Sequence, residues 1–298
     1  MIKIIKAKTS LGSNNHGTEL APDTLFRAGL ESVLKENSLQ FEEVAVTSKN
    51  YSEQKNGYTK NLNQIVRLNK NIFNETLSGL KSGKKTILLG GDHSTAIGSM
   101  FATKKFNNRS VVVYIDAHPD LQSPETSKTG NAHGMPLATV LGDSLYPHFT
   151  EYKPFKKSEV LLIGIKDIDP AESEYIKKNK IKSLPMEHTT QFGIGATVDE
   201  LLKWVDKRPV HLSLDIDSID HEYAPGTGII NKGGFTYREI KYLCKRLSST
   251  NILSIDVVEV NPKKDVGTKT IDLTIELIVN LLGGEWSPYQ QYINSSNK

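Results

Sequence analysis

Cysteine and long apolar runs are scarce in this chain of 298 residues. Cys244 is the only cysteine, so no internal disulfide can form, and the composition gives no reason to expect secretion. No apolar run approaches the ~20 residues of a membrane span, and residues 1–6 are too short and too interrupted by lysine for a signal peptide. We therefore expect a cytoplasmic protein with no membrane partner.

The chain also has little excess of one charge over the other, and it lacks the glycine-rich loops that bind phosphate groups. The 37 Lys and Arg against 34 Asp and Glu leave a net charge of +3, too small and too scattered for a dedicated nucleic-acid surface. No G-x-G-x-x-G or Walker loop follows the early strand-like runs, which disfavours a nucleotide-binding protein. No repeat or low-complexity linker divides the sequence. We expect one domain over residues 1–298, with a polar tail that frays from about residue 285.

Strand-like and helix-like runs alternate along the chain. Strands are expected at residues 2–7, 43–47, 86–89, 111–115, 160–165, 181–184, 210–215 and 252–257. Helices are expected at residues 22–34, 62–82, 95–104, 170–179, 198–206, 237–247 and 271–282, with a polar loop at 48–61. This alternation predicts an α/β fold with a mostly parallel sheet and helices on both faces. In such sheets ligands bind outside the carboxyl ends of the strands.

Six potential metal ligands follow or end three of these strands. They are His93, Asp116, His118, Asp120, Asp215 and Asp217. A lone Asp-x-Asp often only caps a helix or lines a turn, and a lone histidine is more often structural than a ligand. All three segments together favour a metal site, and four carboxylates with two imidazoles suit two divalent cations of the manganese type. Such a pair generates a nucleophile at neutral pH, so the pattern indicates metal-assisted hydrolysis.

Three further polar residues lie close to these segments. Asp92 precedes His93 and is expected either to orient the loop or imidazole or to cap the following helix. Glu259 follows the last strand, where a carboxylate either holds a cationic substrate or pairs with a neighbouring Lys or Arg. His133 lies on a glycine-flanked loop, where it either shuttles protons or orders the loop.

The three segments resemble the ureohydrolase family of binuclear manganese enzymes. The matching residues are Gly-Gly-Asp-His-Ser at 90–94, Asp-Ala-His-Pro-Asp at 116–120 and Ser-x-Asp-x-Asp-x-x-Asp at 213–220, within a resemblance that runs from about residue 17 to 283. The resemblance implies a three-layer α/β/α sandwich, two Mn²⁺ per subunit and assembly as a homo-oligomer, a trimer or a hexamer.

The resemblance also implies a role for each ligand. One manganese would be held by His93, Asp116, Asp120 and Asp215, and the other by Asp116, His118, Asp215 and Asp217. A hydroxide bridging both ions would attack the guanidinium carbon. Asp120 would then relay a proton to the leaving amine, His133 would help to protonate it, and Glu259 would face the guanidinium.

Other segments resemble the arginase branch of the family, which hydrolyses L-arginine to L-ornithine and urea. By this likeness the substrate-binding residues are Gln122, Ser127, Thr129, Asn131, Asp169, Glu172 and Glu259. Gln122 stands where arginases usually have Asn, His221 where they have Pro and Ile229 where they have Thr. An agmatinase, guanidinobutyrase or formimidoylglutamase is therefore the nearest alternative. A non-catalytic metal-binding protein of this fold is a further one, although no ligand is missing.

Overall fold

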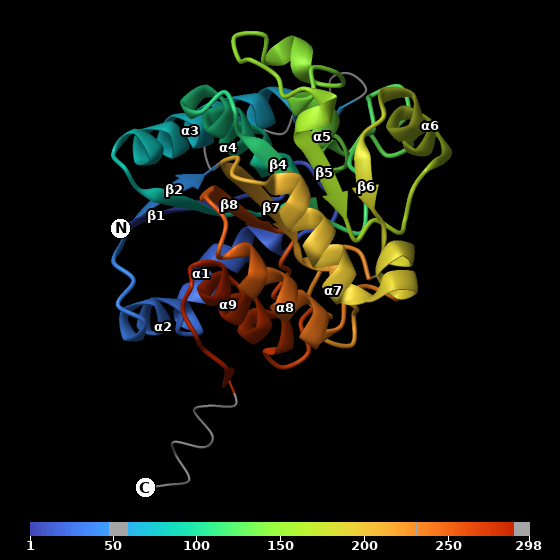
Figure 1. The fold of residues 1–298 in the computed structure, drawn as a ribbon. Helices are drawn as coiled ribbons and strands as arrows, with labels where there is room; N and C mark the ends of the chain where they lie inside the picture. The colour runs from blue at the N-terminus through green and yellow to red at the C-terminus, as the bar shows by residue number, and fades with distance from the viewer. Residues whose placement is uncertain (48–58, 231, 289–298) are drawn as a thin grey trace, which may run out of the picture.

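An eight-stranded sheet forms the centre of the molecule in this computed structural model, which describes residues 1–47, 59–230 and 232–288 (Figure 1). The strands are β1 (Ile2–Lys8), β2 (Phe41–Thr47), β3 (Lys85–Leu89), β4 (Val111–Ile115), β5 (Val160–Ile163), β6 (Lys182–Leu184), β7 (Val210–Asp215) and β8 (Ile252–Val258). All neighbouring strands are parallel, in the order β2-β1-β3-β8-β7-β4-β5-β6. Most of the predicted loop at 48–61 and of the predicted tail lies outside the described residues.

Helices cover both faces of this sheet (Figure 1). One layer contains α3 (Leu62–Lys81), α4 (Ala96–Phe106), α5 (Pro136–Val140) and α6 (Pro170–Asn179). The other contains α1 (Ala21–Arg27), α2 (Leu30–Glu36), α7 (Met186–Val205), α8 (Tyr237–Leu247) and α9 (Lys269–Leu281). The predicted three-layer α/β/α sandwich is confirmed. None of the described helices is both long and apolar enough to cross a membrane.

The central strands are buried on both faces, which explains their continuous apolar runs. In β4, Val111, Val113 and Ile115 pack into the core beneath α8 and α9, whereas Val112 and Tyr114 pack into the core beneath α4. Side chains alternate across a strand, so a strand covered by helices on both faces needs apolar residues at every position. The turn to polar residues at Asp116 therefore marks the carboxyl end of the strand.

The helices depart from expectation by more than two residues in three places. The helix expected at 22–34 is interrupted, because Gly29 adopts a left-handed conformation (φ 108°) and separates α1 from α2. Helix α7 begins at Met186 rather than at 198, and bends at Gly193 (φ 79°). Helix α5 was not expected, and begins with Pro136 at its first position, where proline needs no amide partner.

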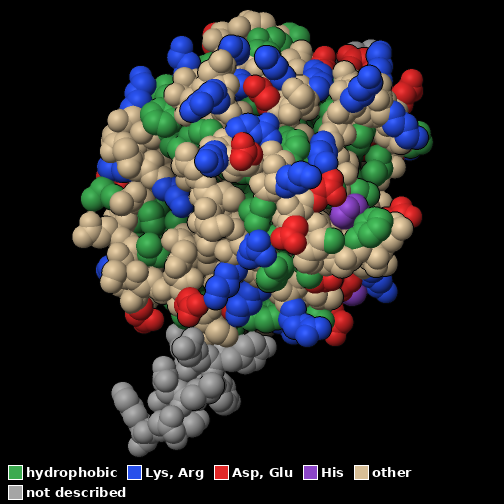
Figure 2. Space-filling model, viewed as in Figure 1, with side chains coloured by type: hydrophobic (Ala, Val, Ile, Leu, Met, Phe, Trp, Pro, Cys, Tyr) green, Lys and Arg blue, Asp and Glu red, His purple; other side chains and the backbone are tan. Residues whose placement is uncertain are grey.

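Basic side chains are interspersed with acidic ones on the face of the molecule that Figure 2 shows. Some exposed charged residues of the molecule are paired, as in Lys245–Glu285 at 2.9 Å and Arg246–Asp199 at 3.4 Å. Exposed pairs of this kind contribute little to stability.

Replacing Gly98 with alanine is expected to lower the free energy of unfolding by about 1–3 kcal/mol, the usual cost of overpacking. Gly98 lies where α4 crosses α3, and an added Cβ would come within 2.2 Å of the backbone oxygen of Asn69. Gly195 of α7 is the matched control, because nothing lies within 4 Å of its Cβ position. Gly195→Ala should raise stability by about 0.5–1 kcal/mol. Urea denaturation of both variants measures the difference, and equal midpoints would contradict the packing argument.

Candidate metal centre

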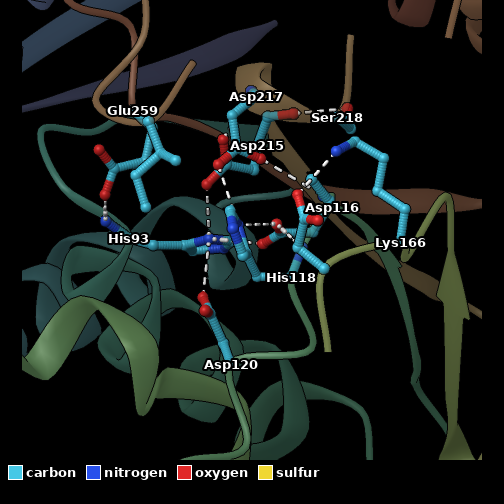
Figure 3. Close-up of polar contacts among 12 residues, drawn as sticks. His93, Asp116, His118, Asp120, Lys166, Asp215, Asp217, Ser218 and Glu259 are labelled. Carbon is cyan, nitrogen blue, oxygen red and sulfur yellow. Dashed lines mark hydrogen bonds and ion pairs between the residues drawn. The ribbon is translucent and has the colours of Figure 1, made fainter. Parts of the chain in front are cut away.

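The candidate ligands and Glu259 lie at the carboxyl ends of four neighbouring strands, β3, β8, β7 and β4. His93 follows β3, Asp116 follows β4, Asp215 ends β7 and Glu259 follows β8. Figure 3 shows these side chains converging on one small region. Residues from 93 to 259 meet because β7 and β8 insert between β3 and β4 in the sheet.

Close backbone packing places the loop that carries His93. A Cβ on Gly91 would lie 1.6 Å from the backbone oxygen of Thr9, so only glycine fits there. Asp92 accepts hydrogen bonds from the amide of Ser94 at 3.0 Å and from the amide of Gly12 at 3.0 Å. It therefore fastens this loop to the segment after β1, as expected, and caps the short turn His93–Thr95, whereas the following helix α4 begins without a side-chain cap.

His93 lies among more carboxylates than hydrogen bonding can satisfy. Its Nδ1 lies 3.1 Å from Asp116 Oδ2, 3.1 Å from Asp120 Oδ2 and 3.0 Å from Asp215 Oδ2. One ring nitrogen carries at most one hydrogen, so three acceptors around it fit a cation better than a proton. Its Nε2 lies 2.9 Å from Ser213 Oγ. Donation from Nε2 to that hydroxyl leaves the Nδ1 lone pair free for a metal.

A second group of ligands adjoins the first and shares one member with it. His118 Nδ1 lies 3.1 Å from Asp217 Oδ2 and 3.6 Å from Asp116 Oδ1. Asp116 therefore belongs to both groups, with His93 and Asp215 in one and with His118 and Asp217 in the other. Asp116 Oδ2 is buried and accepts no hydrogen bond from the described residues, although His93 Nδ1 lies 3.1 Å away. An unsatisfied buried carboxylate oxygen and an all-carboxylate and imidazole donor set both fit a pair of divalent cations.

The electrostatics of the cluster also favour bound cations. Burial and neighbouring carboxylates raise the pKa of Asp120 and of Asp215 well above the usual range. Burial also acts to raise the pKa of Asp116, but contacts with His118 and His93 lower it to about 2. The pKa of both histidines is raised in turn, because nearby carboxylates outweigh burial. Without positive charge these carboxylates repel one another, and divalent cations relieve that repulsion.

Two residues of the site adopt backbone conformations that side chains rarely take. Asp120 has φ 51° and Glu259 has φ 62°. Left-handed conformations of residues other than glycine cluster at functional sites, where surrounding structure holds them in place.

A pocket of about 460 Å³ opens above the ligands. All the residues predicted to bind substrate line it, namely Gln122, Ser127, Thr129, Asn131, Asp169, Glu172 and Glu259. The metal-ligand candidates that line it are His93, His118, Asp120, Asp215 and Asp217, and Asp116 is buried beneath them. Asp169 and Thr129 are exposed. The pocket thus has a buried acidic end at the cluster and an open polar mouth.

Two loops at the mouth are tied together. Gln122 Nε2 donates to Asp169 Oδ2 at 2.6 Å across the pocket mouth. Glu172 is buried and accepts from the amide of Leu121 at 3.0 Å and from the amide of Asp169 at 3.2 Å. Glu172 therefore holds the loop after β4 against the start of α6.

Buried Glu259 and partly buried His133 form an ion pair beside the cluster. Glu259 Oε1 accepts from the His93 amide at 3.0 Å and lies 3.2 Å from His133 Nδ1. Burial acts to lower the pKa of His133, but the contact with Glu259 raises it to about 9. The pKa of Glu259 is lowered, because His133 outweighs burial. A Cβ on Gly228 would lie 2.7 Å from Glu259 Oε2, so a glycine at 228 keeps that oxygen accessible.

Tyr114 is the main residue of the site that the sequence analysis missed. It is fully buried in β4, and its hydroxyl lies 2.8 Å from Asp120 Oδ2. Strand periodicity could have indicated it, since Tyr114 and Asp116 are two residues apart and therefore lie on the same face of the sheet.

Comparisons with known proteins agree with this geometry. The family model described as Arginase family matches residues 1–283. The arginase of Staphylococcus aureus (strain MSSA476) is 34% identical over 297 residues, covering 95% of this chain and 97% of that protein. The crystal structure of the Bacillus subtilis arginase is 32% identical, with a TM-score of 0.88 over 95% of this chain and 99% of that one. The structure of the Entamoeba histolytica arginase with L-ornithine has a TM-score of 0.88 at 27% identity, covering 95% and 97%. Because the family model matches residues 1–283 and relatives above 30% identity cover 95% of the chain, this protein belongs to the arginase family.

Proposed function

We propose that this chain hydrolyses the guanidinium group of L-arginine to L-ornithine and urea, with two Mn²⁺ ions per subunit. The observation that carries the proposal is the pair of ligand groups sharing Asp116, at the base of a pocket with carboxylate and amide groups at its mouth. Curated relatives are named arginase, and one similar structure holds L-ornithine, the expected amino-acid product.

In this proposal each ligand keeps its predicted place. One cation is held by His93, Asp116, Asp120 and Asp215, and the other by Asp116, His118, Asp215 and Asp217. When bound, such a pair lowers the pKa of a coordinated water to about 7 and so supplies a nucleophile at neutral pH. Asp120 Oδ1, which accepts no hydrogen bond from the described residues, takes up the proton released on attack and passes it to the leaving amine. His133 helps to protonate that amine.

The pocket residues position the substrate between the cluster and the mouth. Glu259 Oε2 accepts from the guanidinium, and the buried carboxylate offsets its positive charge. Asp169 receives the α-ammonium group, and Glu172 supports it. The α-carboxylate is bound by Gln122, Ser127, Thr129 and Asn131. A site with partners for both α-groups discriminates against agmatine, which has no carboxylate.

The test is urea release from the manganese-loaded protein, run in parallel on L-arginine, agmatine and 4-guanidinobutyrate. We expect urea from L-arginine alone. Preference for agmatine or guanidinobutyrate would keep the binuclear chemistry and overturn the roles of the mouth residues. No urea from any of the three, with two cations bound, would contradict the proposal.

Chelation is expected to abolish urea release and to lower the melting temperature. A cation at a thousandfold excess over its Kd stabilises the folded chain by about 4 kcal/mol, and its removal withdraws that contribution. Calorimetry before and after EDTA treatment measures the change, and Mn²⁺ should restore both activity and melting temperature. A melting temperature that does not respond to Mn²⁺, Co²⁺ or Ni²⁺ would contradict a resident metal pair.

We further propose that residues 1–298 act as one α/β domain, that the chain works in the cytoplasm and that it assembles as a homotrimer or homohexamer. The assembly follows from the resemblance to ureohydrolases, and light scattering coupled to size-exclusion chromatography tests it.

A further inference from the structure

Tyr114 makes close contact with two of the candidate ligands although it belongs to neither ligand group. Its ring is stacked on the His93 imidazole, with centroids 4.8 Å apart and planes inclined by 2°. Its hydroxyl lies 2.8 Å from Asp120 Oδ2 and 3.3 Å from His93 Nδ1. The side chain is completely buried. A buried hydroxyl is costly unless it is hydrogen-bonded, so these contacts require an explanation beyond packing.

The hydroxyl acts as a donor to Asp120. An ordinary phenol has a pKa of about 10 and so keeps its proton at neutral pH, and the 2.8 Å contact places that proton toward Asp120 Oδ2. Its single hydrogen can reach either Asp120 Oδ2 or His93 Nδ1. Once a cation uses the Nδ1 lone pair, the Asp120 carboxylate is the remaining acceptor of the two.

Asp120 has little else to hold it. Apart from the contact with His93, no other group in residues 1–47, 59–230 and 232–288 donates a hydrogen bond to its carboxylate. Its backbone is in the left-handed region, at φ 51°. Its side chain borders the open pocket, where it could rotate away from the cluster. The hydrogen bond from the buried Tyr114 hydroxyl therefore sets the orientation of the Asp120 carboxylate.

We propose that Tyr114 is a positioning residue, which orients Asp120 with its hydroxyl and His93 with its ring so that the cation these two residues hold binds more tightly. The inference rests on the proposed binuclear centre and goes beyond it, because it assigns unequal support to the two cation positions. The ligands of the other position, His118 and Asp217, have no contact with Tyr114 among those of the described residues.

The test is calorimetric titration of the metal-free protein with Mn²⁺, for the wild type and for Tyr114→Phe. The variant keeps the ring over His93 and removes only the hydroxyl. We expect one of the two sites to bind 10- to 100-fold more weakly, the usual effect of losing a partner of a metal ligand, and the other to be unchanged. Tyr237→Phe is the matched control, since Tyr237 also donates to a buried carboxylate, Glu276 Oε2 at 2.7 Å, away from the cluster. It should change neither affinity.

A double-mutant cycle separates positioning from a general structural role. In an Asp120→Ala background, Tyr114→Phe should weaken the remaining Mn²⁺ affinity no further, because the acceptor is already gone. An equal loss in both backgrounds, or unchanged affinities in Tyr114→Phe, would overturn the inference. Tyr114→Leu, which lacks the ring and any hydrogen-bond donor, should show at least the same loss and replaces the phenylalanine variant if that one does not fold.

The titration also distinguishes this inference from the proposed function. A wild-type chain that binds no pair of cations would overturn both. A wild-type chain that binds two cations and releases no urea would overturn the function, and the weakened site in Tyr114→Phe would still support the positioning role. Normal urea release by the wild type with identical titrations of the two proteins would overturn the positioning role alone.

Discussion

Asp116→Ala is expected to reduce urea release from L-arginine at least about a thousandfold, because the metal pair supplies several kcal/mol of transition-state stabilisation. Asp116 belongs to both ligand groups found among the described residues, and with Asp215 it is one of the two residues proposed to hold both cations. Its Oδ2 lies 3.1 Å from His93 Nδ1 and its Oδ1 lies 3.6 Å from His118 Nδ1. Removing it takes a ligand from both cations at once, so the loss should exceed that of any ligand in one group only.

The measurement combines urea release with metal content, since loss of fold would also abolish activity. Asp116→Ala should fold, bind fewer than two cations and show no rise in melting temperature with Mn²⁺. Asp199→Ala is the control, because Asp199 is exposed on α7 and, among the described residues, pairs only with Arg246 at 3.4 Å. It should retain full activity. An Asp116→Ala protein that still binds two cations and turns over arginine would show that the shared position is not required.

The carboxyl ends of the strands made the ligand set predictable from the sequence. A run such as Val111 to Ile115 is apolar at every position because helices cover both faces of β4. The run stops where the strand leaves the core, and Asp116 is the first residue beyond it. The same reasoning placed His93 and Asp215. The sequence therefore showed, at each strand separately, where apolar residues give way to polar ones. The parallel arrangement of the strands then places these polar residues at one edge of the sheet.

Features that depend on contacts between distant segments could not be predicted in the same way. Gly91 must be glycine because the backbone of Thr9, more than eighty positions earlier, lies against it. Tyr114 looked like one more apolar residue of a strand until the fold placed Asp120 over its hydroxyl. The left-handed conformation of Glu259 likewise has no signal in its own neighbours. In each case the cause is tertiary, and a single sequence carries no record of it.

The residues at the pocket mouth that differ from the usual arginase residues also combine a local signal with contacts that the sequence does not show. The sequence indicated that Gln122 keeps an amide but adds a methylene, and left its consequence open. In the structure this longer side chain spans the mouth and donates to Asp169 at 2.6 Å. Ile229 lines the same pocket and is partly exposed. Residue identity thus located the region that we propose to determine specificity, whereas the contacts made there follow from the distance between two loops.

Glu259→Gln is expected to lower kcat/KM for L-arginine by about 30-fold to several thousandfold. Removing the charge of a buried, hydrogen-bonded partner costs about 2–5 kcal/mol. Glutamine keeps an oxygen to accept from the His93 amide, so the loop after β3 should hold. Glu259 belongs to neither ligand group, and uptake of two cations should therefore be unchanged. The loss should reflect the missing negative charge opposite the guanidinium.

Two further readouts separate this role from a structural one. In the metal-free variant the pKa of His133 should fall below about 9, since Glu259 is the main group that raises it against burial, and NMR titration of the imidazole measures this. Glu276→Gln is the matched control, because Glu276 is also fully buried and pairs with Lys241 at 2.6 Å on the far layer. That control should lower stability and leave kcat/KM intact. A Glu259→Gln protein that loses a cation together with activity would instead assign Glu259 to the support of His93, and one within threefold of wild type would remove it from substrate binding altogether.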